Sequence, residues 1–482
     1  MYINNKLLIA KNKEKSIYLL PNMICRHGLI TGATGSGKTT TLKVLIESLS
    51  AASIPVFVVD VKSDLAATCL KGDISQVEKR VKDLELDGFK NESFPVNFLD
   101  LYKEKGIPIR TTVDNIGYRL LSKMLDLNTS QEGILAICMQ IAKDENIKLI
   151  NLEDLRKLLS FVSDNKKEYT VKYGNINSQS IGAIERSLLV LQQDGGDYFF
   201  GNPTFDLKDL MHYDTNNGYG FINILDAVSL FRKPTLYAIF LIWLLNELYN
   251  TLPEVGEVSK PKLVLCFDEA HLLFDDMPSY LIKQIIQIVK LIRSKGVGIY
   301  FISQLPNDIP DEVLSQLGNK IQHVLRSYTP NDEKAIKAVS NSFRTNPNLK
   351  IDEEVKNLAT GEVLISFLDE LGNPSMVEKA KVLPPQSKMG TLSDDIRDSI
   401  VKSSNLYSKY YNEVKEESNI DKLVSEKEKQ KNTESKNKEE KSKTTSKTKK
   451  TAVDKYTTKL TNKVINTVGR QIGNKIVKGI FK

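Results

Sequence analysis

A glycine-rich segment near the N-terminus carries the residue types that bind a nucleotide phosphate. It reads Gly32-Ala33-Thr34-Gly35-Ser36-Gly37-Lys38-Thr39, fits the pattern GxxxxGK[ST], and lies between an apolar run and an amphipathic helical pattern. The glycines let backbone N–H groups close around phosphate oxygens, and the N-terminus of the following helix adds a favourable dipole. Lys38 is expected to bridge the β- and γ-phosphates, and the Thr39 hydroxyl to bind Mg²⁺. We therefore predict a site for ATP and Mg²⁺ formed by these residues and by Thr40, which follows them.

Two acidic residues, Asp268 and Glu269, directly follow a second apolar run, LVLCF. Hydrolysis of a nucleotide requires an acid that positions the metal ion and a group that prepares the attacking water. We expect Asp268 to hold the Mg²⁺ shell through its threonine or a water, and Glu269 to orient or deprotonate the attacking water. An acidic pair at a strand end is common, and the glycine-rich motif upstream is what favours the catalytic interpretation.

Gln304 stands at the end of a third apolar run, GIYFIS, which begins at Gly298. In a parallel sheet the carboxyl end of this strand would lie beside the γ-phosphate. We expect Gln304 to sense the state of the nucleotide and to position water. The alternative is that Gln304 only begins a loop.

Apolar runs of strand length precede each of these chemical groups and recur along the chain. Six buried strands are expected, at residues 24–31, 54–60, 263–268, 297–303, 321–326 and 362–367. Apolar residues at helical spacing lie between some of them, from Leu42 to Leu49 and from Ile282 to Ile292, where Gly296 is a plausible stop. Strands that alternate with helices predict an α/β fold with a mostly parallel sheet.

The segment between the second and third expected strands is too long for one crossover. It contains helical patterns near 112–165 and 178–193. We therefore predict an ATPase domain at residues 1–388, with a largely helical insertion at about 100–215. No internal repeats are found.

The character of the chain changes after the Pro384-Pro385 pair. A helical extension is expected at 389–415. Residues 416–450 are almost entirely Lys, Glu, Ser, Thr and Asn, and they predict a disordered charged linker because they cannot bury a core. Residues 451–482 regain apolar residues, mostly four apart, with lysines along another face. This pattern predicts a basic amphipathic helix.

The formal net charge of +7 is concentrated at the C-terminus. Residues 441–482 hold twelve Lys or Arg and one acid, Asp454, a net charge of +11. The other 440 residues therefore sum to −4. The body lacks a surface-wide basic character, whereas the basic helix is compatible with DNA, an anionic membrane or a partner protein. The alternative for this helix is that it packs on its own oligomer.

Cysteine usage and the N-terminus favour a reducing, cytoplasmic setting. The four Cys are far apart without a CxxC pair, and the four His show no ligand spacing, so we expect neither disulfides nor a zinc site. The N-terminal residues lack the apolar region of a signal peptide. The most apolar stretch, at 234–249, is shorter than the roughly 20 residues of a membrane span and carries Asn246 and Glu247. We expect a buried core helix there.

Taken together, these blocks resemble the HerA-like ATPases of the HerA/FtsK class, and in particular the bacterial family with a helicase HerA-like C-terminal domain. The resemblance covers roughly residues 5–390. It rests on RHG at 26–28, VFVVDVKSD at 56–64, SQEGIL at 130–135, YGNINSQSIGAIERSL at 173–188, GGDYFFGNP at 195–203, FDEAHLLF at 267–274, LIRSKGVGIYFISQ at 291–304, IQHVLRSYTPNDEKAIKA at 321–338 and VLPPQS at 382–387. The resemblance implies a RecA/FtsK-like P-loop fold.

The resemblance also implies a homo-hexameric ring that moves on DNA, with ATP bound between subunits. Such a ring takes an arginine from the neighbouring subunit, and Arg293 matches the position where the class places it. The alternative for Arg293 is a solvated cation at a helix C-terminus, and Arg326, at the end of a later expected strand, is the second candidate. Asp60, Lys62 and Asp64 match a family block whose role the sequence does not define.

One departure from the class limits what the resemblance implies. HerA itself carries a β-barrel domain before its P-loop, whereas here the P-loop begins at Gly32. Functions that depend on the barrel, including pairing with a nuclease, are therefore not expected to carry over. Three functions stay open: an ATP-driven DNA translocase or helicase-like motor, an ATPase acting on protein or at a membrane, and a nucleotide-gated assembly that does not translocate.

Overall fold

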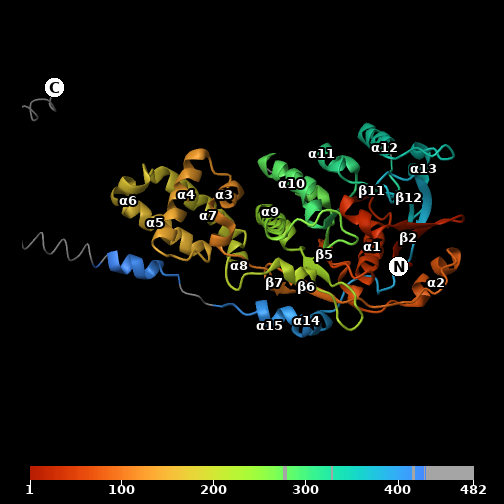
Figure 1. Cartoon of the computed structure of the whole chain (residues 1–482), viewed down its shortest axis with the longest axis horizontal. Helices are drawn as coiled ribbons and strands as arrows, with labels where there is room; N and C mark the ends of the chain where they lie inside the picture. Colours follow the sequence, from red (N-terminus) through yellow and green to blue (C-terminus); the bar gives the residue numbers. More distant parts are fainter. Residues whose placement is uncertain (275–278, 327–328, 415–417, 428, 430–482) are drawn as a thin grey trace, which may run out of the picture. The chain divides into compact units, whose positions relative to one another are not determined.

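The computed structural model describes residues 1–274, 279–326, 329–414, 418–427 and 429 of the chain (Figure 1). The chain divides into two compact units, Met1–Ser418 and Asn419–Lys482. Of the second unit the structure describes a short helical segment at 420–427. The predicted amphipathic helix at 451–482 and most of the predicted linker at 416–450 lie outside the described residues.

A central sheet organises the first unit, and most of its strands are parallel. Eight neighbouring strands run parallel in the order β11, β4, β10, β9, β5, β8, β6, β7. Their bounds are β4 Gly28–Thr31, β5 Val56–Asp60, β6 Val96–Asp100, β7 Ile107–Pro108, β8 Ile222–Asp226, β9 Leu263–Phe267, β10 Val297–Ser303 and β11 Asn319–Gln322. Strands β5, β9 and β10 are buried at every residue, as expected of strands covered by helices on both faces.

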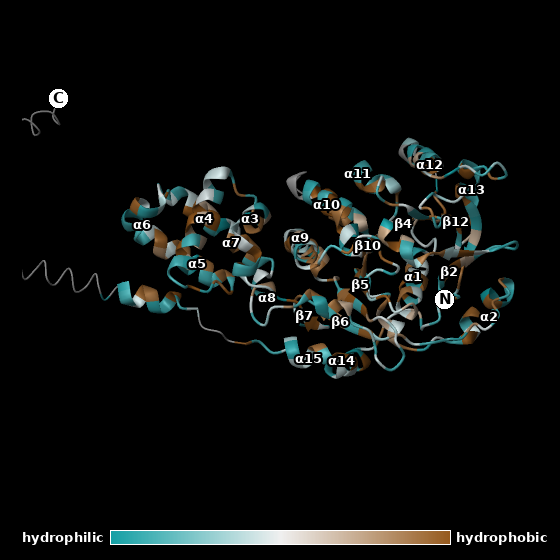
Figure 2. Ribbon diagram, in the orientation of Figure 1, coloured by the Kyte–Doolittle hydropathy of each residue, from teal (hydrophilic) through white to brown (hydrophobic). Residues whose placement is uncertain are grey.

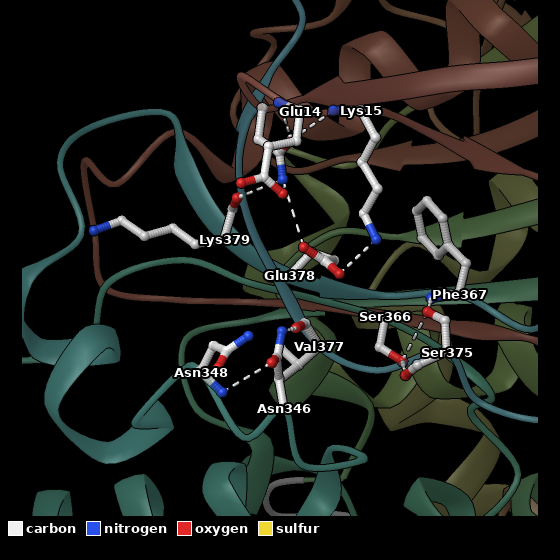
Figure 3. Close-up of polar contacts among 11 residues, drawn as sticks. Glu14, Lys15, Asn346, Asn348, Ser366, Phe367, Ser375, Val377, Glu378 and Lys379 are labelled. Atoms are coloured by element: carbon white, nitrogen blue, oxygen red, sulfur yellow. Dashed lines mark hydrogen bonds and ion pairs between the residues drawn. The ribbon is translucent and has the colours of Figure 1, made fainter.

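Antiparallel strands extend the sheet beyond β11. They are β1 Tyr2–Ile3, β2 Lys6–Lys11, β3 Ser16–Leu19, β12 Glu362–Ser366 and β13 Glu378–Val382. Polar side chains tie this extension together (Figure 3): Lys15 Nζ lies 2.5 Å from Glu378 Oε1, and Asn346 donates to the carbonyl of Val377 at 3.0 Å. The N-terminal hairpin is thereby fixed to residues more than 300 positions later in the chain.

Helices cover the sheet and fill the long connections. Longer helices are α1 Lys38–Ala51, α2 Ile74–Asp83, α3 Val113–Met124, α4 Thr129–Asp144, α5 Leu152–Asp164, α6 Lys166–Tyr173, α7 Ser178–Gln193, α9 Pro234–Thr251, α10 Ser279–Leu291, α12 Pro330–Ser342 and α14 Asp394–Ser403. Shorter ones are α8 Gly196–Phe199, α11 Asp311–Leu314, α13 Ile351–Asn357, α15 Asn405–Tyr410 and the 3-10 turns η1 Pro21–Arg26, η2 Ala66–Cys69, η3 Leu207–Met211, η4 Leu230–Arg232, η5 Ala270–Leu273, η6 Ile292–Lys295 and η7 Pro306–Asp308. In Figure 2 many of these ribbons mix brown and teal segments, as amphipathic helices do.

Helices α3 to α8 form a cluster between strands β7 and β8, within the segment for which a helical insertion is predicted. Its helices have strong start signals. Asn128 and Gln131 form a reciprocal capping box at α4, and Asn151 and Asp154 form one at α5. The predicted domain boundaries, including the insertion at about 100–215, remain predictions.

Helix α9 is buried along most of its length, as predicted for a core helix. In the described part of the chain, no helix combines enough length and apolar character to cross a membrane.

The segment after β13 is hydrogen-bonded to helix α1, and the helices that follow it pack against β6 and β7. Glu47 of α1 is buried and accepts hydrogen bonds from the backbone N–H groups of Gln386 (2.8 Å) and Ser387 (3.1 Å) and from the Ser387 hydroxyl (2.5 Å). Helices α14 and α15 then lie along β6 and β7 (Figure 1). They are two short helices where one was expected, because Ser404 breaks the helix, caps α15, and donates to Asn97 of β6.

All six expected strands are found, although two of them have different bounds from those predicted. The structure also contains strands that the sequence did not predict. The run at 24–31 begins as the 3-10 turn η1 before it becomes β4, and the run at 321–326 forms a strand only at Asn319–Gln322. Strands β6 and β8 were not expected. Each carries a buried asparagine, and Asn97 donates to Asn223 at 3.0 Å, so a polar residue interrupts each apolar pattern.

Candidate nucleotide site

The glycine-rich loop joins β4 to α1, and β4 lies between the parallel strands β11 and β10. Gly37 has φ 107° and stands immediately before α1, and Gly35 has φ 75°, both in the left-handed region that favours glycine. A side chain at Gly32 would also meet His323, because an added Cβ would lie 2.4 Å from the Cβ of that residue. The loop therefore needs glycine both for its backbone angles and for its packing.

Lys38 lies at the mouth of this loop and is largely buried. Its ammonium group donates to the carbonyl oxygens of Gly32 at 2.6 Å and Ala33 at 3.1 Å. Burial lowers the pKa of Lys38, although the charge of Glu269 opposes this effect. The lysine is thus held by loop carbonyl groups within the field of Glu269. Ala33, Thr39 and Thr40 are partly exposed, Thr34 and Gly35 are exposed, and Ser36 is buried.

His323, which directly follows β11, packs against the glycine-rich loop and contacts the elements on either side of it. Its backbone N–H donates to the carbonyl of Thr31 at 2.7 Å, and its Nε2 lies 2.9 Å from the hydroxyl of Thr41 in α1. Burial and, to a smaller extent, the charge of Lys38 together lower the pKa of His323 to about 4. A neutral imidazole therefore links β4, β11 and α1. This histidine has no ligand-like spacing in the sequence, and the parallel pairing of β11 with β4 brings it to the loop.

Asp268 and Glu269 follow β9, as the apolar run predicts. Both are buried, and the backbone N–H of Glu269 donates to Asp268 Oδ1 at 3.0 Å. Burial raises the pKa of Asp268 to about 6, and the neighbouring charge of Glu269 contributes to the rise. A buried carboxylate of this kind, together with the Thr39 hydroxyl on the same edge of the sheet, is an oxygen donor set that suits Mg²⁺.

Glu269 has an unusual backbone and a cationic partner. Its φ of 48° and ψ of 52° place a non-glycine residue in the left-handed region. One carboxylate oxygen, Oε1, forms an ion pair with Nζ of Lys62, which follows β5. Burial would raise the pKa of Glu269, but the hydrogen bond and charge of Lys62 bring it below its usual value. Lys62, which belongs to the family-like segment at 56–64, thus contacts the acidic pair. The sequence did not predict this contact.

Gln304 directly follows β10 and lies next to the glycine-rich loop. Its carbonyl oxygen accepts a hydrogen bond from the backbone N–H of Gly32 at 3.2 Å, and its side chain is exposed. The loop, Gln304 and the acidic pair therefore share the carboxyl edge of the sheet, because β4, β10 and β9 are parallel neighbours.

Arg293 lies at the opposite edge. It belongs to η6, which precedes β10, and it forms an ion pair with Glu257 Oε1 at 2.6 Å. Arg26, which precedes β4, binds the same oxygen at 3.0 Å. The seven residues of β10 span roughly 20 Å at a rise of about 3.3 Å per residue. Arg293 and Arg26 are therefore far from the glycine-rich loop of their own chain.

The two arginines face a cavity of about 810 Å³. Both arginine side chains are about one-third exposed, and Lys6, Lys260 and Glu370 also line this cavity. The sequence singled out Arg293, whereas Arg26 was noted only as part of a family block.

Arg326 is not at the end of a strand. Strand β11 ends at Gln322, the next residue, His323, contacts Thr31 of β4 and Thr41 of α1, and Arg326 is exposed in the segment that follows. Since β11 is parallel to β4, this segment begins at the same edge as the glycine-rich loop. The expectation that a strand places Arg326 is therefore wrong.

A glycine-rich loop between a central parallel strand and a helix, with an acidic pair ending a strand two positions along the sheet, defines a P-loop ATPase. The family model described as helicase HerA-like C-terminal matches residues 5–482, and the chain belongs to this family.

Among curated proteins, the chain is similar to enzymes named DNA double-strand break repair helicase HerA. The one from Sulfurisphaera tokodaii is 26% identical over 370 residues, 74% of this chain and 65% of the relative. The one from Saccharolobus solfataricus is 24% identical over 383 residues, 74% of this chain and 64% of the relative. The chain thus spans just under two thirds of the length of these relatives.

Among solved structures, the chain resembles the bacterial conjugative coupling protein TrwB. An unbound form has a TM-score of 0.53 at 13% identity and covers 82% of this chain and 92% of TrwB. A complex of TrwB with a non-hydrolysable ATP analogue also has a TM-score of 0.53 at 13% identity, with 81% and 97% covered. This likeness shows a shared P-loop fold.

Proposed function

We propose that this protein is an ATP-hydrolysing motor whose active sites form between subunits of a ring, and that DNA is the polymer on which it acts. One observation carries the proposal. The glycine-rich loop and the acidic pair lie at the carboxyl edge of the sheet, whereas Arg293, the arginine that the family resemblance favours, lies at the amino edge. In this proposal a second copy therefore supplies Arg293, and Arg326, whose segment begins at the carboxyl edge, is the alternative.

Each residue at the carboxyl edge has a defined task in this proposal. Backbone N–H groups of residues 32–40 and the Lys38 ammonium bind the phosphates, and Glu269 orients or deprotonates the attacking water. Gln304 reports the state of the γ-phosphate to β10. Thr39 and Asp268 would hold Mg²⁺, which neutralises charge on the phosphate oxygens when it is bound.

At the amino edge, Arg293 is the proposed group that stabilises transition-state charge on the neighbour's nucleotide. An exposed carboxylate, Glu257, holds it beside Arg26, so two guanidinium groups are presented together. A planar guanidinium that presents several N–H donors suits a phosphate oxyanion. Since most oligomers of one chain have closed symmetry, a head-to-tail contact of this kind generates a ring, and a hexamer is the form that the family resemblance favours.

The choice of DNA is supported by the names of the curated relatives, which are DNA repair helicases. The body of the chain, residues 1–440, carries a net charge of −4, so basic side chains gathered in a central channel would have to provide binding.

The proposal is tested by measuring ATP hydrolysis with duplex DNA, single-stranded DNA or anionic liposomes, beside a mass measurement of the assembled protein. We expect a ring and a rate that increases with DNA. An increase with liposomes alone would instead favour an ATPase that acts at a membrane. Hydrolysis that no polymer or liposome changes would favour a nucleotide-gated assembly, and a strictly monomeric active enzyme would contradict the shared site.

A further inference from the structure

Lys62 is the cation that contacts the carboxylate of Glu269. Its backbone N–H donates to Asp60 Oδ1 at 3.1 Å, so the turn after β5 fixes the start of the side chain. Its ammonium group then forms the ion pair with Glu269 Oε1. The Lys62 side chain is 46% exposed and that of Glu269 only 8%, so the lysine is the partner that solvent and other molecules can reach.

The order of strands gives this ion pair a direction. The sheet runs β4, β10, β9, β5, so the strand before Glu269 has the P-loop strand on one side, beyond β10, and the strand before Lys62 on the other. Lys62 therefore reaches Glu269 from the neighbouring strand that lies on the far side of β9 from β10 and β4. The ion pair ties one carboxylate oxygen of Glu269 to the turn that follows β5.

The second oxygen of Glu269, Oε2, is buried and has no hydrogen bond within the described part of the chain. The Nδ1 atom of His271 lies 3.4 Å from it and likewise has no hydrogen-bond partner there. Buried polar atoms without partners carry a free-energy cost, and such an atom in an acidic pair is consistent with strain or a catalytic role. The left-handed backbone of Glu269 is a second sign of a residue held under strain.

We propose that Lys62 is a positioning residue that restrains Glu269 in a resting orientation, and that the ion pair must open before Glu269 can act on water. The inference rests on the proposed hydrolysis of ATP and adds a control to it. Hydrolysis is slow while Lys62 holds the carboxylate, and it accelerates when the half-exposed lysine is drawn away. The restraint acts on turnover and not on nucleotide binding, because Lys62 contacts the acid.

The test compares full-length wild type with Lys62→Ala, measuring kcat and KM for ATP without DNA and the affinity for a fluorescent ATP analogue. Loss of a partly buried ion pair is expected to raise the basal kcat about threefold to tenfold, with KM and nucleotide affinity changed less than about twofold. The stimulation by duplex DNA should shrink in proportion, because the restraint is already absent.

Three further variants separate a restraint from a structural effect. Lys62→Arg retains a cation and should return the basal rate to the wild-type level. Lys62→Ala combined with Glu269→Gln should be inactive, since the gain requires the carboxylate. Lys79→Ala, at an exposed position of α2, removes the same charge and should leave the rate unchanged.

The outcomes separate this inference from the function on which it rests. A slower or unchanged Lys62→Ala enzyme, with wild type active, overturns the restraint and leaves ATP hydrolysis standing. Weakened nucleotide affinity in Lys62→Ala would assign the lysine to the phosphates and also overturn the restraint. A wild-type protein that hydrolyses no ATP under any condition overturns the proposed function and the restraint with it.

Discussion

Opposite charges around the glycine-rich loop hold one another in place at the scale of single residues. Lys38 lies in the field of Glu269, and Glu269 is in turn paired with Lys62. Burial drives the pKa of Asp268 upward, so a cation beside it would favour its ionised form. Each group in this cluster thus depends on a neighbour for its charge state, and single substitutions should separate binding from turnover.

Lys38→Ala and Glu269→Gln should fail in different ways. Loss of the Lys38 ammonium removes a phosphate contact, so ATP binding should weaken and hydrolysis should stop. Glu269→Gln keeps the shape of the side chain but removes the proton acceptor, so binding should persist while kcat falls by about 10²- to 10⁴-fold. Equilibrium binding of a fluorescent ATP analogue and a phosphate-release assay measure the two effects. Normal turnover by Glu269→Gln would show that another group prepares the water.

The sequence predicted those residues of the site that lie in contiguous motifs. Residues 32–39 and the acidic pair could be found because local spacing identifies them. Lys62 meets Glu269 across 207 positions, and Arg293 meets Glu257 across 36, and no local pattern encodes such pairs. His323 was equally hidden, because only strand order places it beneath the loop.

The helices and strands also differ in how well their own sequence predicts them. Buried central strands such as β5, β9 and β10 were predictable, because each is a continuous apolar run. The antiparallel strand β13, EKAKV, places lysines on either side of an alanine and is only partly buried, so its sequence carries little strand signal. Its pairing with β12 and β2 is decided by tertiary structure.

His27 joins two of these elements and should make stability depend on pH. Its Nε2 donates to the carbonyl of Val289 at 2.9 Å and its Nδ1 accepts from the N–H of Ile299 at 3.0 Å, so the folded state needs the neutral ring. Burial lowers its pKa from 6.5 to about 4. Between these values the unfolded chain binds more protons, so the contribution of His27, about 3 kcal/mol, is lost as pH falls.

Thermal unfolding of wild type and His27→Asn at pH 7.5 and pH 5.0 checks this expectation. Asparagine tolerates the positive φ of 55° at this position. The stability advantage of wild type should shrink at the lower pH. His212→Asn, at an exposed position, should show the same difference from wild type at both values. An advantage of equal size at both pH values would contradict this expectation, because it would mean that folding leaves the pKa of His27 unchanged.

The variant Ser387→Ala measures how much the hydrogen bonds between α1 and the segment after β13 contribute to stability. Removing this hydroxyl takes one of three hydrogen-bond donors from the buried carboxylate of Glu47. The change should lower the free energy of unfolding by about 1 to 3 kcal/mol, because the carboxylate stays buried with fewer partners. Chemical denaturation of the full chain measures it. Ser408→Ala, on the exposed face of α15, is the control and should have little effect.

For the whole molecule, the two edges of the sheet divide the proposed active site between copies. This division predicts complementation between variants that are inactive for different reasons. Arg293→Ala subunits keep an intact glycine-rich loop, and Lys38→Ala subunits keep an intact arginine. In a 1:1 mixture about a quarter of the sites would pair the two intact halves, so about a quarter of wild-type hydrolysis should return.

The mixing experiment needs two controls. Each variant alone should be inactive and should assemble to the same mass as wild type. Arg186→Ala, at an exposed position of α7, should be active without mixing. If the mixture forms joint assemblies and stays inactive, Arg293 does not act on the neighbour, and Arg26 in the same cavity becomes the residue to exchange next.

The proposed sharing of each active site between two chains has a consequence for expression level in the cell. A site that needs two chains turns over in proportion to the encounters between chains, so enzyme output would rise more steeply than the number of copies made. At low copy number the protein would consume almost no ATP, whatever the supply of nucleotide. A modest rise in transcription would then act as a threshold, and a gene carried in a few extra copies would yield far more hydrolysis than its dosage alone implies.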